Sequence, residues 1–262
     1  MSGAVRVEDQ GRVRIVTLNR PDALNAFNDA MYDGVRDALV DAQHAKGVAC
    51  VVVTGEGDRA FSAGQDLGEM AKRPRHDDGK PHGFVPFIEV VETFEKPFIA
   101  AVNGLAIGIG TTMLAHADIV IAADSARFRA PFVSLGITME AGSSYNLPGR
   151  IGWQETAHAV FTGAWMDSAR AVETGLAWKR VPDDKLMEET LAIAGEIAAM
   201  PITGLVATKR LLLATKVEHS KAARAREDAE ILALAGGPAQ REALAAFREK
   251  RPADFTNLPD AE

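Results

Sequence analysis

Two glycine-bearing turns in the first half of the sequence constrain the fold of this chain more than any other feature. They occupy residues 60–67 (AFSAGQDL) and 103–111 (NGLAIGIGT), and each leads from an apolar stretch to the start of a helix. A helix N-terminus presents unpaired backbone N–H groups and a partial positive charge. Two such donors aimed at one oxygen form an oxyanion hole, which could stabilise the enolate of a thioester.

The apolar pattern around these turns predicts alternating strands and helices. A helix is expected over 29–45, because Asn28 can cap it and its apolar residues fall on one stripe. Such alternation is typical of an α/β architecture. The expected strands, which are apolar and largely β-branched, cover 13–18, 48–54, 98–102 and 119–122.

The pattern becomes helical toward the C-terminus. Isolated helices of this length need a partner surface. With 262 residues the chain is long enough for one large domain or a core with a small appendage. We therefore predict an α/β core over 1–200 and a helical oligomerisation segment over 201–262. The expected helices are 183–200, 202–216, 219–235 and 238–250.

A polar, charged segment interrupts the core at 72–83, where proline and glycine are frequent. Its composition predicts a mobile loop. The segment could be a solvated connector or a lid over an acyl pocket. The sequence leaves both readings open.

Composition narrows the classes of function. The chain is 47% hydrophobic and 25% charged, which is typical of a folded protein, and its net charge of −7 disfavours nucleic-acid binding. Cys50 is the single cysteine, so an internal disulfide is impossible, which fits a reducing compartment. The N-terminus has no apolar signal core, the C-terminus has no peroxisomal ending, and no apolar run is long enough for a membrane span. We expect a cytoplasmic protein without membrane contact, and without a bound metal, because the six histidines lack metal-ligand spacing.

Together with the segment 18–26 (LNRPDALNA), the two turns resemble the crotonase (enoyl-CoA hydratase/isomerase) superfamily over nearly the whole chain. The resemblance implies a spiral of ββα units followed by a C-terminal helical segment that packs between the subunits of a trimer. A homotrimer or a dimer of trimers is therefore expected. The implied partner is an acyl-CoA thioester, with coenzyme A as part of the substrate and no further cofactor.

The resemblance also assigns residues to the site. Its two oxyanion-hole N–H groups fall on Gln65 and Ile109, although many relatives have glycine at the second position. Phe247 and Lys250 match a C-terminal motif that approaches coenzyme A bound to a neighbouring subunit, and Lys250 could equally be a basic helix end favoured by the helix dipole. The other matches to coenzyme A-binding positions are Asp22, Ala23, Leu24, Ala63, Asp66 and Leu67.

The acid/base residues depart from the hydratase pattern. Hydratases of this superfamily use two glutamates, and the corresponding positions here are Thr112 and Phe132, which cannot activate water. The segment 130–148 instead resembles the Δ3,Δ2-enoyl-CoA isomerase branch, which has a carboxylate where Glu140 stands. A single carboxylate between C2 and C4 could take a proton from one carbon and return it to the other. The alternative for Glu140 is a helix-start carboxylate, in which case Asp66 and Glu69 are the next candidate bases.

Three other functions stay open. The chain could be a hydratase with a displaced acid/base set, a ring-opening or ring-expanding acyl-CoA isomerase of the phenylacetate type, or a coenzyme A-thioester binder without turnover. Ser62 raises the possibility of a serine hydrolase, but Ala60 stands where the nucleophile elbow needs its first glycine. A dinucleotide fingerprint at 108–113 is weak, because Met113 takes the place of its third glycine.

Overall fold

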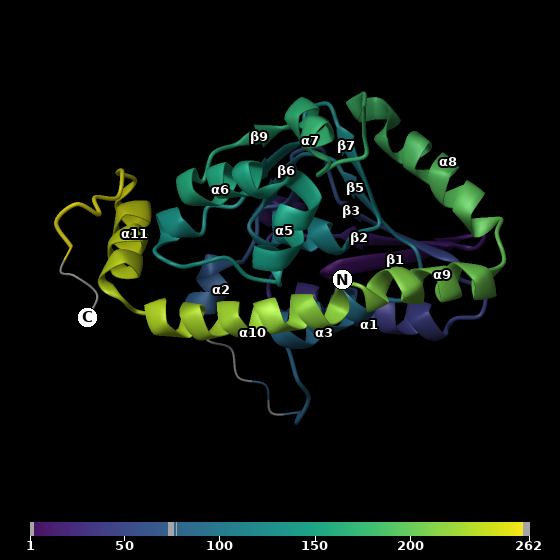
Figure 1. The fold of residues 1–262 in the computed structure, drawn as a ribbon, viewed down its shortest axis with the longest axis horizontal. Coiled ribbons are helices and arrows are strands. Elements are labelled where there is room, and N and C mark those ends of the chain that lie inside the picture. The colour runs from purple at the N-terminus through teal and green to yellow at the C-terminus, as the bar shows by residue number, and fades with distance from the viewer. Residues whose placement is uncertain (1–2, 73–75, 77, 259–262) are drawn as a thin grey trace.

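The computed structural model describes residues 3–72, 76 and 78–258. Two β-sheets form its centre, and helices surround them (Figure 1). The larger sheet has six strands in the order β1-β2-β3-β5-β7-β10, and all its neighbours are parallel except the β1–β2 pair. Its strands are β1 (Val5–Gln10), β2 (Val13–Leu18), β3 (Cys50–Gly55), β5 (Phe98–Val102), β7 (Ile119–Ala123) and β10 (Lys179–Val181).

The smaller sheet has the order β4-β6-β8-β9, with β4, β6 and β8 parallel and β9 antiparallel to β8. The chain alternates between the sheets: β3, β5 and β7 lie in the large sheet, and each is followed by a strand of the small one. This is the expected α/β spiral of ββα units. The strands of the small sheet are β4 (Ala60–Ser62), β6 (Leu105–Ile107), β8 (Arg127–Arg129) and β9 (Met166–Asp167).

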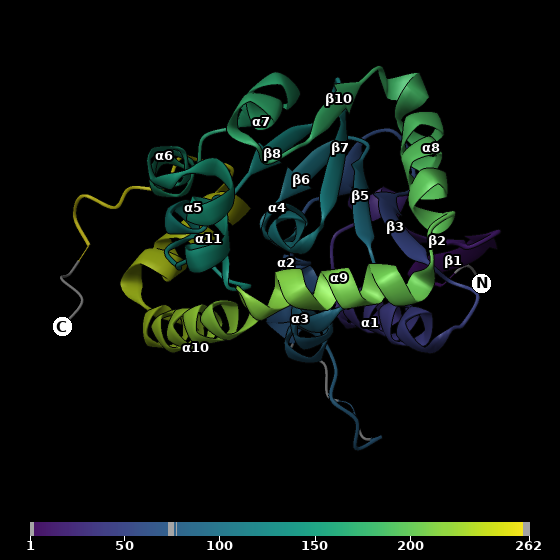
Figure 2. The ribbon, with the colours of Figure 1, turned by 45° about the vertical axis from the view of Figure 1, so that its right-hand side comes forward.

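Helices cover the large sheet and extend from it. The helix α8 contacts β2, β3, β5 and β7 and helps to bury these strands (Figure 2). Most of their residues are apolar, as expected of parallel strands covered by helices, although Arg14 and Thr17 interrupt β2. The α-helices are α1 (Asp29–His44), α2 (Leu67–Lys72), α3 (Phe84–Thr93), α4 (Ile109–Thr112), α5 (Ser143–Ile151), α6 (Trp153–Thr162), α7 (Ser168–Thr174), α8 (Leu186–Ala198), α9 (Ile202–Ala214), α10 (Val217–Leu234) and α11 (Pro238–Glu249). Short 3₁₀ helices are η1 (Pro21–Ala23), η2 (Met113–His116), η3 (Val133–Leu135) and η4 (Asp183–Lys185).

The structure confirms the elements that the apolar pattern predicts. The strands over 13–18 and 98–102 match β2 and β5, and the other two differ from their predictions by at most two residues at an end. Asn28 caps α1 as expected, because its side-chain oxygen accepts from the Met31 amide at 3.0 Å. The strand β1 was not predicted; every residue after Val5 in it is exposed, so it lacks the buried apolar run that marks the central strands.

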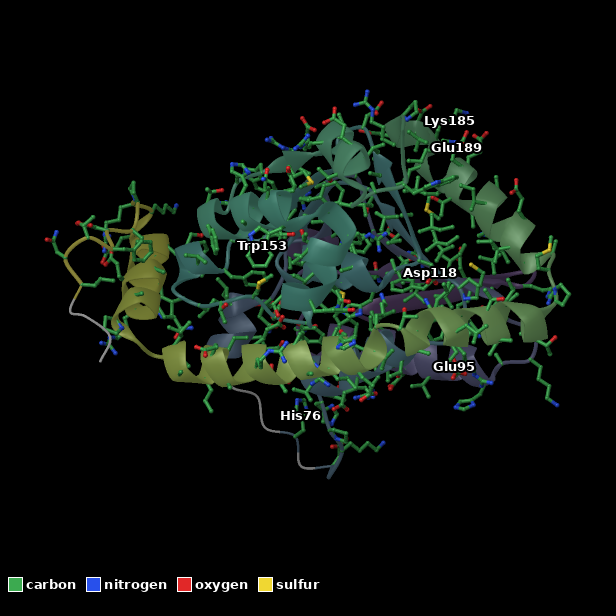
Figure 3. All side chains as sticks on the ribbon, viewed as in Figure 1. His76, Glu95, Asp118, Trp153, Lys185 and Glu189 are labelled. Atoms are coloured by element: carbon green, nitrogen blue, oxygen red, sulfur yellow. The ribbon has the colours of Figure 1, made fainter. Side chains whose placement is uncertain are left out.

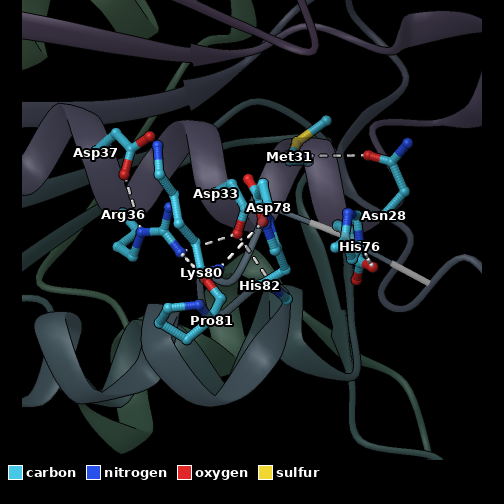
Figure 4. Close-up of polar contacts among 12 residues, drawn as sticks. Asn28, Met31, Asp33, Arg36, Asp37, His76, Asp78, Lys80, Pro81 and His82 are labelled. Atoms are coloured by element: carbon cyan, nitrogen blue, oxygen red, sulfur yellow. Dashed lines mark hydrogen bonds and ion pairs between the residues drawn. The ribbon is translucent and has the colours of Figure 1, made fainter. Parts of the chain in front are cut away.

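The polar segment 72–83 is attached to α1 where the structure describes it. His82 lies between the carboxylates of Asp33 and Asp78, and its Nε2 is 2.9 Å from the latter (Figure 4). His76 is 2.7 Å from Asp29 and stacks on His82, with the ring centroids 3.9 Å apart. Residues 73–75 and 77 lie outside the described part, so the expected mobility of this segment stays a prediction.

The C-terminal helices α9, α10 and α11 follow α8 in order, and the first of them is connected to the large sheet. The Lys209 side chain of α9 pairs with Asp118, which also accepts from the Phe98 amide at 2.8 Å and so connects the helix to the sheet (Figure 3). The helix α10 then runs along the molecule toward α11 at its far end (Figure 1). Among the described residues no single helix is long and apolar enough to cross a membrane, although the pair 183–198 and 202–214, bent by 103°, passes the same test jointly.

Several large apolar side chains of these helices are exposed in the single chain. They fit a surface that another subunit would cover, as the oligomerisation segment predicts, but the predicted boundary at residue 200 and the trimer itself stay predictions. The exposed side chains on α9, α10 and α11 include Leu211, Leu212, Leu232 and Phe247.

Candidate active site

The two glycine turns meet at the ends of neighbouring strands. They follow β4 and β6, which are hydrogen-bonded parallel neighbours, so both turns leave the same edge of the small sheet. Gly64 has φ +89°, and a Cβ on it would lie 2.8 Å from the Ile107 oxygen. Gly108, with φ +55°, lies directly opposite, since its own Cβ would be 3.9 Å from the Gly64 Cα. Glycine is required at residue 64 because the second turn approaches too closely for a side chain.

Each of the two turns at this contact carries an amide without a backbone hydrogen-bond partner among the described residues. The amide of Phe27 donates to the Gly64 oxygen at 2.7 Å, and the Asp66 amide donates to the Phe27 oxygen at 2.8 Å. The Gln65 amide lies between these two bonds and has no partner among the backbone hydrogen bonds of the described residues. Ile109 is the first residue of α4, so its amide also precedes the helical ladder. The geometry therefore supports an oxyanion hole at the two residues that the sequence proposed.

The side chain of Gln65 is held by a buried tyrosine. The Tyr32 hydroxyl donates to the Gln65 Oε1 at 2.7 Å, and Tyr32 itself is only 1% exposed. Its ring packs on Phe27, Phe84 and Phe87, with centroid separations of 4.8, 5.9 and 5.2 Å. The aromatic cluster thus fixes the tyrosine, and the tyrosine fixes the residue that carries one oxyanion amide.

Glu140 lies on an unusual turn before α5. Ala141 and Gly142 both have left-handed backbones, with φ of 62° and 68°, and this conformation is unfavourable for alanine. The Nε2 of buried His116 lies 2.8 Å from the Ala141 oxygen. Burial lowers the pKa of His116 to about 4, so the ring is neutral at pH 7 and donates through its Nε2–H. Because η2 continues directly from α4, the segment that begins with the Ile109 amide also anchors the Glu140 turn.

The environment of Glu140 suits a general base. Burial, together with the nearby Glu227 and Asp228 carboxylates, raises the pKa of this carboxyl to about 7. The negative charge of Glu140 in turn contributes to the high pKa of Tyr32, after burial, which places the carboxylate close to the Tyr32–Gln65 pair. A carboxyl that titrates near neutral pH can both accept and return a proton.

The alternative role for Glu140, a helix-start carboxylate, belongs to another residue. Glu227 of α10 accepts from the Gly142 amide at 2.7 Å and the Ser144 amide at 2.6 Å, at the N-terminus of α5. The carboxylate of Glu140 makes none of the side-chain hydrogen bonds found within the described residues. It is therefore available for a substrate.

The other candidate groups are engaged in the fold. The Asp66 carboxylate pairs with Arg20 at 2.9 Å and caps α2 by accepting from the Gly68 and Glu69 amides. Glu69 accepts from the Asp29 amide at 2.9 Å. Neither carboxylate is a free base.

Ser62 is also committed to the fold. It is fully buried, and its Oγ accepts from the Gly64 amide at 3.2 Å. The serine therefore stabilises the first glycine turn, and its hydroxyl is not exposed as a hydrolase nucleophile requires.

The residues at the two positions of the hydratase glutamates carry no free polar group. Thr112 is fully buried, and its hydroxyl donates to the Gly108 oxygen at 3.3 Å within the same turn of helix. Phe132 is 4% exposed and packs with Ala130 and Val160, against Met139. Neither position could hold an ionised water-activating group without repacking.

The expected coenzyme A positions fall into two groups. The first is continuous, because the Ala63 amide donates to the Leu24 oxygen at 2.9 Å and so joins residues 22–24 to the first glycine turn, which continues into Asp66 and Leu67. Leu24 has a left-handed backbone, φ 51°, and closes η1 at this place. The second group, Phe247 on α11 and Lys250 directly after that helix, is exposed, as a contact to a neighbouring subunit would require. Binding of coenzyme A at either group stays a prediction.

Three residues of the site were not found from the sequence. Tyr32 lies in the apolar stripe of α1 and gave no sign of its hydrogen bond. His116 and Glu227 were missed because their partners are backbone atoms distant in the sequence. One sequence signal of Glu227 did exist. It shares the buried face of α10 with Ser220 and Ala223, and an acidic residue at a buried spacing indicates a partner inside the fold. No set of three metal-ligating side chains occurs in the part of the chain that the structure describes.

Comparison with known proteins assigns the family. The sequence profile named enoyl-CoA hydratase/isomerase matches residues 8–258. A probable enoyl-CoA hydratase of Rhizobium meliloti (strain 1021) is 34% identical over 250 residues, 95% of this chain and 96% of that protein. The 1,2-epoxyphenylacetyl-CoA isomerase of Escherichia coli (strain K12) is 32% identical, over 93% of this chain and 95% of that protein.

A solved structure agrees. The enoyl-CoA hydratase/isomerase of Pseudoalteromonas atlantica T6c superposes with a TM-score of 0.92 at 34% identity, over 97% of this chain and all of that one. The high score covers the ββα spiral and the C-terminal helices together. The chain belongs to the enoyl-CoA hydratase/isomerase family, the crotonase superfamily.

Proposed function

We propose that this protein is an enoyl-CoA isomerase that moves a double bond from C3 to C2 of a coenzyme A thioester. The observation that carries the proposal is the carboxylate of Glu140, which makes no side-chain hydrogen bond within the described residues and lies on a turn anchored by the segment that begins with the Ile109 amide. Its pKa of about 7 suits both proton transfers. The family is enzymatic and acts on coenzyme A thioesters, so the proposal concerns the reaction within that family.

The mechanism uses the site residues in two steps. Ionised Glu140 takes a proton from C2 of the 3-enoyl thioester, and the electrons move into a dienolate whose oxygen accepts from the Gln65 and Ile109 amides. The protonated Glu140 then delivers its proton to C4, the C2–C3 double bond forms, and the thioester carbonyl is restored. No water, metal or redox group is consumed in this sequence.

Hydration is the less favourable reading, although several relatives are named as hydratases. It needs a carboxylate pair to orient and activate water, and Thr112 and Phe132 occupy those positions. We expect the turnover number for hydration of crotonyl-CoA to lie below the roughly 1–10³ s⁻¹ typical of enzymes. A hydration rate within that range would overturn the isomerase assignment.

A second candidate is a ring-modifying acyl-CoA isomerase. The relative named 1,2-epoxyphenylacetyl-CoA isomerase favours it, since it matches this chain at 32% identity. Such a reaction would use the same oxyanion amides. A panel that contains 3-enoyl-CoA esters and an epoxide of an aryl acetyl-CoA separates the two candidates by which substrate turns over.

The decisive variant is Glu140→Gln, which keeps size but removes the proton acceptor. We expect kcat for 3-enoyl-CoA isomerisation to fall about 10²–10⁴-fold, with little change in substrate affinity, because the backbone amides remain. Exchange of the C2 proton with deuterated solvent should fall in parallel. Binding of 3-enoyl-CoA without any absorbance change in the wild type would instead favour a non-catalytic binder.

We also propose a cytoplasmic homotrimer or dimer of trimers. The exposed apolar side chains of α9–α11 support the assembly, and the single buried Cys50 fits a reducing compartment. Phe247 and Lys250 would then approach coenzyme A on the neighbouring subunit.

A further inference from the structure

The turn that carries Glu140 is built against α10, which belongs to the C-terminal helical segment. The Glu227 side chain reaches from α10 to the Gly142 and Ser144 amides, at 2.7 and 2.6 Å, one oxygen to each. Glu227 is 4% exposed, so both hydrogen bonds are shielded from water. Charge-assisted bonds of this kind are among the strong ones in proteins.

The same turn has no room for another arrangement. A Cβ on Gly142 would lie 2.5 Å from the Ser220 Oγ of α10. The Asn146 Nδ2 donates both to the Gly142 oxygen at 2.9 Å and to the Ser220 Oγ at 2.8 Å. The left-handed pair at 141–142 is therefore held from α10 and α5 together, and a left-handed alanine persists only where its surroundings hold it.

Glu227 also affects Glu140 electrostatically. The two carboxylates are near enough for the negative charge of Glu227 to oppose ionisation of Glu140, and Asp228 acts in the same direction. From other elements, Tyr32 of α1 and neutral His116 of η2 face the turn, and the Glu92–Arg224 pair lies beside Ser220, with the Nε of Arg224 3.3 Å from Glu92. The Glu227 carboxylate therefore has two effects on the turn: it holds the backbone, and it disfavours the negative charge on the Glu140 side chain.

We infer that Glu227 is the positioning residue of the candidate base: it fixes the Glu140 turn through the Gly142 and Ser144 amides and places a negative charge beside that turn. This inference rests on the proposed role of Glu140 as proton shuttle. It gives the C-terminal helical segment a part in the chemistry in addition to assembly.

Two variants separate the two parts of this role. Glu227→Gln keeps the size but removes the charge and one amide acceptor, so the acid midpoint of the pH profile of kcat/KM should move down from about 7 toward the ordinary 4.5 of a glutamate. Glu227→Asp keeps the charge but shortens the side chain, so the midpoint should stay closer to that of the wild type while kcat falls by up to about 10²-fold as the base is displaced. Glu230→Gln, the same substitution at an exposed position of α10, is the matched control and should change neither quantity.

Direct titration of Glu140 makes the test independent of turnover. NMR of ¹³C-labelled glutamate, with the Glu140 signal assigned by its absence in Glu140→Gln, should show the Glu140 pKa lowered in Glu227→Gln and unchanged in Glu230→Gln. An unchanged Glu140 pKa in Glu227→Gln, together with wild-type kcat in Glu227→Asp, would overturn the inference. If Glu227→Gln does not fold, an unaltered kcat in folded Glu227→Asp overturns it alone.

The two hypotheses fail in different ways. If the wild type does not isomerise 3-enoyl-CoA but the Glu140 pKa still falls in Glu227→Gln, the proposed function is wrong and the structural coupling stands. If the wild type isomerises and Glu140→Gln abolishes turnover but Glu227 variants leave the pH midpoint and kcat unchanged, the proposed function stands and Glu227 has no part in it.

Discussion

The Tyr32 hydroxyl donates a hydrogen bond of 2.7 Å to the Gln65 Oε1, so a side chain of α1 holds the residue whose backbone amide forms half of the candidate oxyanion hole. Gln65 is joined on both sides to Phe27 through backbone hydrogen bonds of its neighbours. The position of its amide therefore depends on main-chain contacts first and on Tyr32 second.

Tyr32→Phe tests the second dependence. Phenylalanine fits the same aromatic cluster, so the fold should be retained, while the loss of one hydrogen bond, worth about 0.5–1.5 kcal/mol, should lower kcat roughly 3- to 10-fold. Steady-state kinetics with 3-enoyl-CoA and a thermal melt measure both effects. A variant that melts like the wild type and has its full kcat would show that the backbone contacts alone position Gln65.

The raised pKa of Glu140 predicts that this residue destabilises the fold when it is ionised. A carboxyl whose folded pKa lies above its unfolded value binds its proton more tightly in the native state, so its unfavourable effect is absent below about pH 4.5, grows through the interval, and is complete above about pH 7. Glu140→Gln should therefore be more stable than the wild type at pH 8, by at most about 3 kcal/mol, and this gain should largely vanish at pH 4.5. Denaturant unfolding at the two pH values measures the difference. A gain of equal size at both would assign it to packing.

His82 predicts a loss of stability in the same direction, with rising pH, for the segment 78–83, although here the charged form of the side chain is the stabilising one. The Asp33 and Asp78 carboxylates raise the pKa of His82, so the attachment to α1 is complete below the ordinary value of 6.5 and is lost as pH rises through the folded pKa. The Gly83 amide, which donates to Asp33 at 3.1 Å, should lose hydrogen-exchange protection over that interval beyond the intrinsic rate change. His82→Asn should remove this pH dependence. The exposed His158→Asn, on α6, should leave it intact.

Removal of α11 tests the predicted neighbour contact. Truncation after Gly237 should weaken both assembly and coenzyme A binding, because it deletes Phe247 and Lys250 and exposes the face of η3 that α11 covers. Light scattering should give a mass of about 84 kDa or a multiple of it for the full chain, three times 28.0 kDa, and less for the truncated one. Lys250→Ala keeps the helix and should reduce coenzyme A affinity without changing the mass. A 28 kDa full-length species at micromolar concentration would contradict the trimer.

The sequence predicted what depends on local pattern. The strands around Val51 and Ala100 and the cap at Asn28 follow from neighbours within a few residues. The oxyanion role of the Gln65 and Ile109 amides came from a motif match and stays a prediction. The paired turns were recognisable because close backbone approach demands glycine, as at Gly64.

What the sequence did not reveal depends on distance along the chain. Glu227 acts on an amide 85 residues away, and Tyr32 acts on a side chain 33 residues away. The helix-start role considered for Glu140 was local reasoning, and it could not reveal that Glu227, from a helix much later in the sequence, accepts from the Gly142 and Ser144 amides at the start of α5. The exposed strand β1 was missed for a related reason: its pairing with β2, and not its own pattern, defines it.

The contact between Gly64 and Gly108 means that the backbone, and not the side chains of the two turns, sets the positions of the Gln65 and Ile109 amides. The two candidate oxyanion donors follow adjacent strands of one sheet, so the main chain sets their spacing through the repeat between hydrogen-bonded strands, about 4.8 Å. A glutamine and an isoleucine can therefore stand at the two donor positions without altering what the main chain offers. A substitution of either side chain that keeps the two glycines should therefore leave the spacing of the two amides unchanged.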